Sequence, residues 1–345
     1  MRDVAVSIVN TNGRDFLLGC LESLRGVDAD VVVLDNASED GSVEAVREQF
    51  PEVRVIAQEF RDGFGANHNR VIRATRSRYV LVLNEDTIVP AGTVETLVRY
   101  LDTHPEAAVA GPLIRGFDGH QQVSAYRLMS VPVQLVWALT LGRRGAVVSR
   151  GTSPRRVGAV AACAALYRRD ALQAVEMFDE TYFLFGEEGD LSQRLRRLGL
   201  ENHYVPAAEV LHVGQQSTAD VPERQINEVW RSLDIYLSRY HSRLGAHVLR
   251  SLTGIGYGLA VVAAEVATRL PRRLRPRAAA SWQPAIYRLH VRNAFAGVRN
   301  PGIRELAEEW NRRHGSTSKA DATVSVVARR RRETPADRAP RRSTD

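Results

Sequence analysis

The triplet Asn84-Glu85-Asp86 stands directly behind the apolar run 79–83, where a strand would deliver it to the rim of a sheet. Side chains alternate along a strand, so Asn84 and Asp86 share one side of its end. A hard divalent cation prefers carboxylate oxygen, and such a cation, bridging two phosphates, acts as a Lewis acid on a diphosphate leaving group. The triplet therefore indicates a metal-diphosphate site, although a turn or helix-cap acid would have the same local sequence.

A second group of acids, Glu187, Glu188 and Asp190, precedes the amphipathic run 191–198. Carboxylates this close repel one another, which raises the pKa of one of them and suits it to act as a general base. The alternative is that Asp190 caps the helix, because a helix N-terminus attracts negative charge. We favour the catalytic interpretation.

Asp35 and His212 also follow apolar runs, 31–34 and 205–211. A carboxylate at Asp35 can accept a hydrogen bond from the imide N–H of uracil or thymine, or it can close an Asx turn at the start of the next loop. The imidazole of His212 can bind a metal, or it can be a structural histidine.

The elements that must position these residues alternate between strand and helix. Apolar, often β-branched runs predict strands at 4–9, 31–34, 53–56, 79–83, 107–110, 157–167 and 205–211. Helical spacing predicts helices at 16–24, after Ser42, from 63–67 to Arg76, at 93–102 and at 191–198. Short apolar strands joined by helices are typical of an α/β fold with a mostly parallel sheet flanked by helices.

The chain divides by pattern into three parts. Residues 1–218 form the predicted α/β domain, residues 219–314 a helical extension, and residues 315–345 a basic tail whose composition predicts disorder. The stretch 252–266 is apolar apart from Glu265, but it is marginal for a spanning helix, so a helix lying in the membrane plane is favoured.

The net charge of +7 and a pI near 9.8 raise the question of an anionic partner. Nucleic acid is excluded because the first two hundred residues lack interleaved aromatic and basic side chains that would stack bases. Arginines instead gather at 269–277, beside the apolar stretch, and at 329–332. This placement suits an anionic membrane surface, with a solvated basic tail as the alternative.

Cys20 and Cys163 stand apart in apolar contexts, as reduced core residues would in a cytosolic protein. The N-terminus runs straight into a strand pattern without a signal segment. We therefore expect a cytoplasmic protein, peripheral at the inner face of the cytoplasmic membrane.

The loop after the first strand, 10–13, excludes two nucleotide-binding classes. It holds one glycine, whereas a dinucleotide-binding turn needs three for close backbone approach to a pyrophosphate. It also lacks the glycine- and lysine- or arginine-rich composition expected of a sugar-nucleotide nucleotidyltransferase.

The motifs taken together resemble family 2 glycosyltransferases with the GT-A fold, and among them bacterial rhamnosyltransferase-like members. The resemblance covers roughly residues 4–218 and rests on the segments 6–13, 33–42, 63–70, 83–87, 178–180 and 187–191 and on His212. The chain departs from the family at 67–69, 157–163 and 176–178, which leaves the donor sugar open.

The resemblance implies a nucleotide-sugar donor and assigns roles on that side of the site. Thr11 and Asn12 lie under the nucleotide, Asp35 holds the pyrimidine, and Asn69 and Arg70 border the diphosphate.

The resemblance also assigns the metal and the base. Asn84 stands where a D-x-D motif has its first acid, and Asp86 binds Mn²⁺ or Mg²⁺ together with His212. Glu188 matches the base of an inverting enzyme, which takes the proton of the acceptor hydroxyl, and Asp190 is the second candidate for that role.

These observations predict an inverting, metal-dependent glycosyltransferase with a UDP- or dTDP-sugar donor, dTDP-rhamnose by analogy. The predicted acceptor is a cell-envelope glycan or a polyprenyl-linked lipid. The alternative is a catalytically degenerate protein that binds a nucleotide or scaffolds a membrane glycan assembly.

Overall fold

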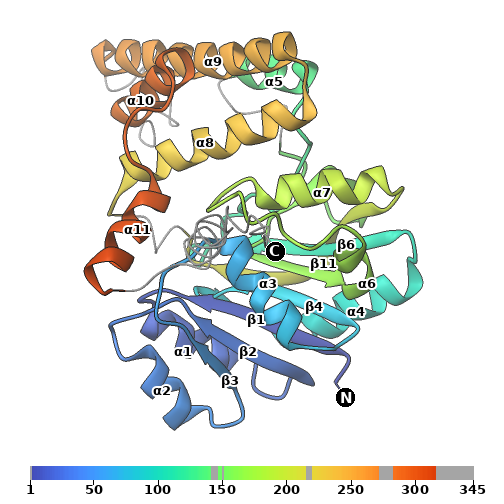
Figure 1. Ribbon diagram of the computed structural model, residues 1–345. Coiled ribbons are helices and arrows are strands. Elements are labelled where there is room, and N and C mark those ends of the chain that lie inside the picture. Colours follow the sequence, from blue (N-terminus) through green and yellow to red (C-terminus); the bar gives the residue numbers. More distant parts are fainter. Residues whose placement is uncertain (1, 141–146, 150, 215–219, 272–282, 316–345) are drawn as a thin grey trace, which may run out of the picture.

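A nine-stranded mixed sheet forms the centre of the molecule in the computed structural model, which describes residues 2–140, 147–149, 151–214, 220–271 and 283–315 (Figure 1). The strand order is β3-β2-β1-β4-β10-β6-β11-β5, with β8 paired to β11. The strands are β1 Val4–Asn10, β2 Ala29–Asp35, β3 Arg54–Ala57, β4 Tyr79–Asn84, β5 Thr87–Ile88, β6 Ala107–Arg115, β8 Arg155–Val157, β10 Ala164–Arg168 and β11 Glu201–His212.

The sheet is mostly parallel, as predicted. β1 pairs in parallel with β2 and β4, and β6 pairs in parallel with β11, while β10 runs antiparallel between β4 and β6. The carboxyl ends of β1, β2 and β4 consequently meet at one edge of the sheet, where Asn10 lies beside Asp35 and Val9 beside Asn84.

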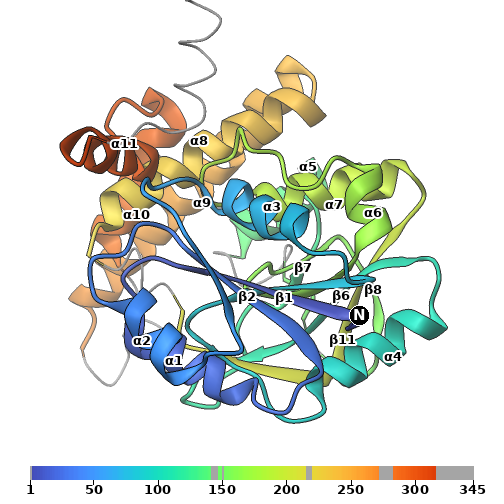
Figure 2. The ribbon, with the colours of Figure 1, turned by 60° about the horizontal axis from the view of Figure 1, so that its bottom comes forward.

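Helices cover both faces of the sheet, because alternate residues of each buried strand supply two separate apolar surfaces. In β4, Leu81 and Leu83 belong to one core, whereas Val80 and Val82 belong to the other. On the first face lie α1 Arg14–Ser23, α2 Ser42–Gln49 and α4 Thr93–Thr103, and on the second α3 Phe64–Ala74, α6 Arg169–Ala174 and α7 Glu187–Arg197 (Figure 2).

The predicted strand 157–167 is wrong in one respect, because it is divided into β8, β9 Ala159–Val160 and β10. β9 leaves the main sheet to pair with β7 Ala125–Tyr126. Gly158 allows the break, since a Cβ there would lie 2.4 Å from the backbone nitrogen of Leu128. The turn 161–163 that follows lines a cavity at the carboxyl ends of β1 and β4.

The C-terminal part is helical, as predicted, and packs above the sheet (Figure 1). It comprises α8 Pro222–Tyr240, α9 Arg243–Arg269, α10 Pro284–Ala296 and α11 Ile303–Arg313, and α9 also packs on α5 Val131–Leu139. α9 is long and apolar enough to cross a membrane by length and composition alone. The predicted basic tail lies outside the described residues from 316 onward.

Candidate active site

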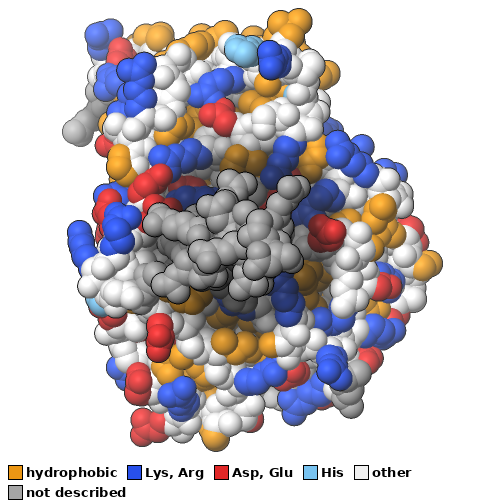
Figure 3. Space-filling model, viewed as in Figure 1, with side chains coloured by type: hydrophobic (Ala, Val, Ile, Leu, Met, Phe, Trp, Pro, Cys, Tyr) orange, Lys and Arg blue, Asp and Glu red, His pale blue; other side chains and the backbone are white. Residues whose placement is uncertain are grey.

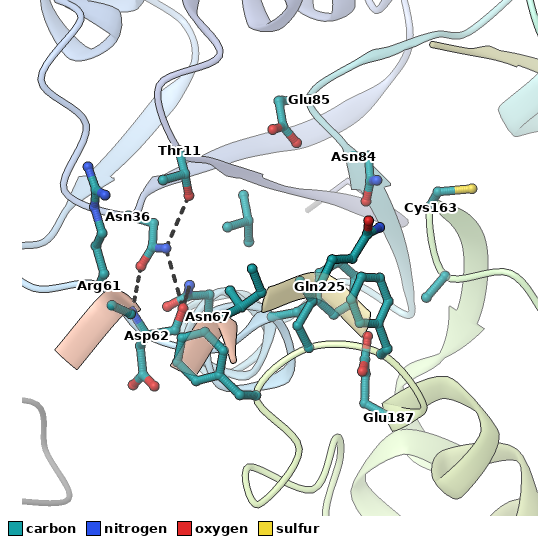
Figure 4. A pocket seen from close by; sticks show the side chains of 18 of the residues that line it. Thr11, Asn36, Arg61, Asp62, Asn67, Asn84, Glu85, Cys163, Glu187 and Gln225 are labelled. Atoms are coloured by element: carbon teal, nitrogen blue, oxygen red, sulfur yellow. Dashed lines mark hydrogen bonds between the residues drawn. The ribbon is translucent and has the colours of Figure 1, made fainter. Parts of the chain in front are cut away.

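A cavity of about 370 Å³, which we call the main cavity because it holds several of the predicted site residues, opens at the carboxyl ends of β1 and β4 (Figure 4). Its floor includes Thr11, Asn84 and Asp86, and the turn 183–188 before and into α7 forms the opposite wall. Residues of α8 and α11 close one side, so the C-terminal helices help to form the site.

Asn36 joins three segments of this cavity. Its amide nitrogen donates to Thr11 Oγ1 at 3.1 Å and to the carbonyl of Asp62 at 3.3 Å (Figure 4). Its amide oxygen accepts from Gln58 Nε2 at 2.7 Å and from the backbone N–H of Asp62 at 2.8 Å. This network fixes the ends of β1 and β2 against the loop before α3.

Gly63 brings that loop against the opposite wall. A Cβ at Gly63 would lie 2.6 Å from the carbonyl oxygen of Phe183, and the adjacent Phe64 N–H donates to the same oxygen at 2.8 Å. Only glycine permits this approach of two backbones.

Asp86 and His212 lie together at the cavity floor, as the metal prediction requires. Asp86 Oδ1 lies 3.2 Å from His212 Nε2 without the alignment of a hydrogen bond, and it has no hydrogen-bond partner among the described residues. The other oxygen, Oδ2, accepts from the backbone N–H of Gly214 at 2.9 Å. Gln122 Oε1 lies 2.8 Å from His212 Nδ1, which leaves Nε2 directed at Asp86.

The pKa values of the titratable side chains in this corner are shifted because charged groups are buried close together. Burial by itself would lower the pKa of His212, but contacts with Asp86 and Cys163 outweigh it and raise that pKa to about 10. Burial by itself would raise the pKa of Asp86, but His212 and the Gly214 N–H lower it. Burial, reinforced by the charge of Asp86, raises the pKa of Glu85 to about 8.

Glu187 and Glu188 face the cavity from the first turn of α7, one turn earlier than the sequence predicts the helix to begin. Burial and the charge of Glu188 raise the pKa of Glu187 well above its usual range. Burial also raises the pKa of Glu188, partly offset by backbone N–H groups and by a hydrogen bond from Tyr126. Each has an Oε2 atom without a hydrogen-bond partner among the described residues. A raised pKa makes each carboxylate a stronger proton acceptor once it is deprotonated, which suits a general base.

We expect Glu187→Gln to stabilise the fold, and increasingly so as the pH rises. The folded-state pKa lies above the ordinary value of 4.5, so the unfolded chain loses its proton first and stability falls as the pH rises between the two values. Glutamine cannot titrate and escapes this loss. Thermal unfolding of parent and variant from pH 4 to pH 8 tests this, and a difference in Tm independent of pH would contradict it.

Asp190 lies outside the cavity, in a buried cluster of donors. Its Oδ2 accepts from Arg194 Nε at 2.7 Å, and its Oδ1 accepts from Tyr240 at 2.6 Å and lies 3.3 Å from Arg239. The side chain is fully buried, so an acceptor hydroxyl has no access to it. The structure thus separates the two predicted candidates, with Glu188 at the cavity and Asp190 away from it.

The residues assigned to the nucleotide are divided between the cavity and its supports. Thr11 lines the cavity, whereas Asn12 and Asp35 lie beside it. Asp35 accepts from Asn10 Nδ2 at 3.0 Å and from the Ser38 N–H at 2.9 Å, which is the Asx turn considered above. Asn12 has a φ of 55° and accepts from the Glu39 N–H at 2.7 Å.

Asn69 and Arg70 also act behind the cavity wall. Asn69 is buried and exchanges two hydrogen bonds with the backbone of Phe178, at 2.8 and 3.0 Å. Arg70 donates to Asp62 at 2.6 Å and to Asn67 at 2.7 Å. These contacts hold α3 and the loop before it in place.

Several lining residues escape prediction from the sequence. Arg61 and Asp62 are marked only by their position before the Gly63 turn, and Gln225 of α8 and Leu306 of α11 have no local signal at all. α11 reaches the site because the side-chain amide of Asn311 exchanges two hydrogen bonds with the Arg61 backbone, at 2.7 and 2.9 Å.

Comparison with known proteins agrees with this geometry. The profile of Glycosyl transferase family 2 matches residues 4–175. The N-acetylglucosaminyl-diphospho-decaprenol L-rhamnosyltransferase of Mycobacterium tuberculosis is 31% identical over 231 residues, 61% of this chain and 75% of that protein. The chain is a family 2 glycosyltransferase. Rhamnosyltransferase WbbL of Escherichia coli is 23% identical over 248 residues, 68% of this chain and 93% of that protein.

Solved structures show the same GT-A fold. The mannosyltransferase PcManGT of Pyrobaculum calidifontis, in complex with GDP-Man and Mn²⁺, superposes with a TM-score of 0.56 at 15% identity, over 86% of this chain and 87% of that one. GalNAc-T7 with UDP, GalNAc and Mn²⁺ gives a TM-score of 0.51 at 15% identity, over 86% of this chain and 56% of that one. The predictions of family, fold and glycosyltransferase activity are confirmed.

Proposed function

We propose that this glycosyltransferase is an inverting, metal-dependent enzyme that moves a sugar, rhamnose from dTDP-rhamnose, to a lipid-linked acceptor of the cell envelope. The observation that carries the reaction type is that Asp86, His212 and Glu188 line one cavity. The donor sugar is suggested by the two bacterial relatives, both of which are named rhamnosyltransferases. The acceptor is suggested by the first alone, whose name includes N-acetylglucosaminyl-diphospho-decaprenol.

In this mechanism Glu188 removes the proton of an acceptor hydroxyl as its oxygen attacks the anomeric carbon. The new bond forms opposite the bond to the nucleoside diphosphate, which breaks and carries its electron pair away, so the configuration inverts. The half-buried Glu188 is held by the Tyr126 hydroxyl, which fixes the carboxylate without occupying both oxygens.

The donor atoms at one corner of the cavity support the metal dependence. The unpartnered Oδ1 of Asp86 and the nearby His212 Nε2 fit a Mn²⁺ or Mg²⁺ ion, which would supply Lewis acidity to the leaving diphosphate. The described residues add no third His, Cys, Asp or Glu to this pair.

Calorimetric titration with UDP, dTDP and GDP, each with and without Mn²⁺, tests the nucleotide and the metal together. We expect dTDP or UDP to bind only with the metal. In Asp86→Asn the metal-dependent affinity should fall by about 100-fold, since a carboxylate ligand is lost. Asp118→Asn, a change of the same type at an exposed loop position, is the matched control. If the nucleotide affinity is the same with and without Mn²⁺ and is unchanged in Asp86→Asn, the metal assignment is wrong.

We also propose that the enzyme is cytoplasmic and lies against the inner face of the membrane through α5 and α9. Exposed apolar side chains gather on these helices at the top of the molecule (Figure 3). They are Val131, Leu135, Val136 and Leu139 of α5 and Leu244, Val248, Ile255, Leu259, Val262 and Val266 of α9. We call this set the apolar face. Arg269 in the last turn of α9, with the arginines that follow it in the sequence, would be drawn to anionic lipids.

We expect Leu139→Glu with Val262→Glu to lower binding to anionic vesicles by about tenfold or more, because two apolar side chains that would enter the lipid are replaced by negative charges. These side chains are 69% and 58% exposed, so the fold should tolerate both changes. Phe117→Glu, which changes a side chain that is 60% exposed outside the apolar face, is the control. Equal vesicle binding by all three proteins would refute the placement.

A further inference from the structure

Two further cavities lie side by side under the first half of α5, and five residues line both of them. The shared residues are Arg127, Leu128, Met129, Val133 and Tyr236. One cavity is mostly apolar and has a volume of about 250 Å³, and we call it the aromatic cavity. The other has a volume of about 620 Å³ and is lined by several arginines, and we call it the arginine cavity.

The aromatic cavity adjoins the catalytic turn. Phe185 and Gly186, which begin the turn bearing Glu188, line it, and so does Gly189 just after. Phe185 also lines the main cavity and has a φ of 69°, which turns the chain sharply between the two spaces. Tyr126, whose hydroxyl bonds Glu188, forms another wall. A group placed here would contact Tyr126, which bonds the proposed base, while Glu188 itself lines the main cavity.

The chemistry of the aromatic cavity suits a sugar ring. Phe185, Tyr126 and Tyr236 present flat apolar surfaces, against which the C–H face of a pyranose packs, while Ser232 and Gln134 supply polar groups. Its volume is of the order needed for one sugar residue and not for a longer glycan.

The arginine cavity has the opposite charge from the main cavity. Arg127, Arg155, Arg156 and Arg196 line it, and its lining includes no Asp or Glu among the described residues. Arg156 is paired with Glu201 at 2.8 Å, but the side chain of Arg196 has no carboxylate within salt-bridge distance in the described part of the chain. His241 Nε2, on this lining, is buried without a hydrogen-bond partner among the described residues and donates in one tautomer of the ring. Arginine is the side chain whose planar fork of donors recognises phosphate groups.

The helix that covers both cavities also carries part of the apolar face. Val133 of α5 points to the cavities, while Leu135 and Leu139 of the same helix are exposed. A molecule leaving the arginine cavity beside α5 would therefore meet an apolar surface.

We propose that these three surfaces bind the acceptor, a sugar joined through a diphosphate to a lipid. The sugar occupies the aromatic cavity with a hydroxyl toward Glu188, the diphosphate lies among the arginines, and the first isoprenoid units lie on the apolar face of α5. This assignment rests on the proposed function and deepens it. The donor diphosphate and the acceptor diphosphate are then recognised differently, the first through a metal and the second through arginine.

The test is calorimetric binding of farnesyl diphosphate and farnesol to the full chain, with nucleotide binding measured on each sample. We expect farnesyl diphosphate to bind and farnesol to bind at least tenfold more weakly. A tenfold change in affinity corresponds to about 1.4 kcal/mol, and a hydrogen bond between arginine and a charged phosphate contributes more than this. Arg127→Glu with Arg196→Glu should weaken farnesyl diphosphate by about 100-fold, whereas Arg47→Glu on the exposed part of α2 should not.

The sugar position is tested separately with N-acetylglucosaminyl-diphospho-farnesol. Val229→Phe fills the aromatic cavity and should weaken this probe by about tenfold while leaving farnesyl diphosphate unchanged. Equal binding of farnesol and farnesyl diphosphate, or parent-like binding by the double arginine variant, would overturn the acceptor site. Normal nucleotide binding without farnesyl diphosphate binding would also overturn it, and would leave the proposed function standing. A parent chain that binds no nucleotide would instead overturn the proposed function.

Discussion

Glu188→Gln should lower the rate of sugar transfer by about 10²–10⁴-fold while nucleotide binding with the metal stays near that of the parent. Glutamine keeps the size of the side chain and can still contact Tyr126, but it cannot accept the proton of the acceptor hydroxyl. The effect should therefore fall on kcat, because the lost interaction belongs to the transition state.

The pH profile gives a second readout for the same residue. Burial raises the pKa of Glu188, and a base works only when it is deprotonated, so transfer should decline as the pH falls through that raised pKa. In Glu188→Gln the residual activity should lose this acidic limb. If Glu187→Gln removes activity and the acidic limb while Glu188→Gln does not, the base is the other carboxylate of the turn. If neither variant changes transfer, the catalytic role of this turn is wrong.

Asp190→Asn should have a different consequence, a loss of about 3–5 kcal/mol in the free energy of unfolding, because it breaks a buried ion pair and leaves Arg194 without its charge partner. Arg239 and Tyr240 of α8 contact the same carboxylate, so the variant loosens the packing of α7 against α8. Denaturant unfolding measures the loss.

The activity of the Asp190→Asn variant decides between support and catalysis. We expect transfer per folded molecule to remain within a few-fold of the parent at a temperature where the variant is folded. Asp179→Asn is a matched control, since Asp179 also pairs with Arg239 but is more exposed, and it should cost less stability. If the Asp190→Asn variant is as stable as the parent but no longer transfers sugar, Asp190 and not Glu188 is the catalytic base.

Much of the catalytic half could be predicted from the sequence, because it depends on local order along the chain. Parallel strands that end in Asp35 and Asn84 must bring those ends to one edge of the sheet, and the pairing of β1 with β2 and β4 does so. His212 could be predicted for the same reason, as the last residue of β11. A functional residue at the end of a strand is therefore positioned by the pairing of that strand in the sheet.

The sequence also determined which residues could do chemistry. Carboxylates that follow apolar runs, and the single glycine of the loop 10–13, can be recognised from residue order alone. It could not decide which acid of 187–190 faces the cavity, because that depends on the rotation of α7 and on partners as distant as Arg239. The tertiary structure alone places Asp190 among donors of α8, Glu188 beside Tyr126, and Leu306 of α11 at the cavity. The reason is physical: period and spacing set the direction of a side chain within its own element, whereas burial and charge partners come from packing between elements far apart in the chain.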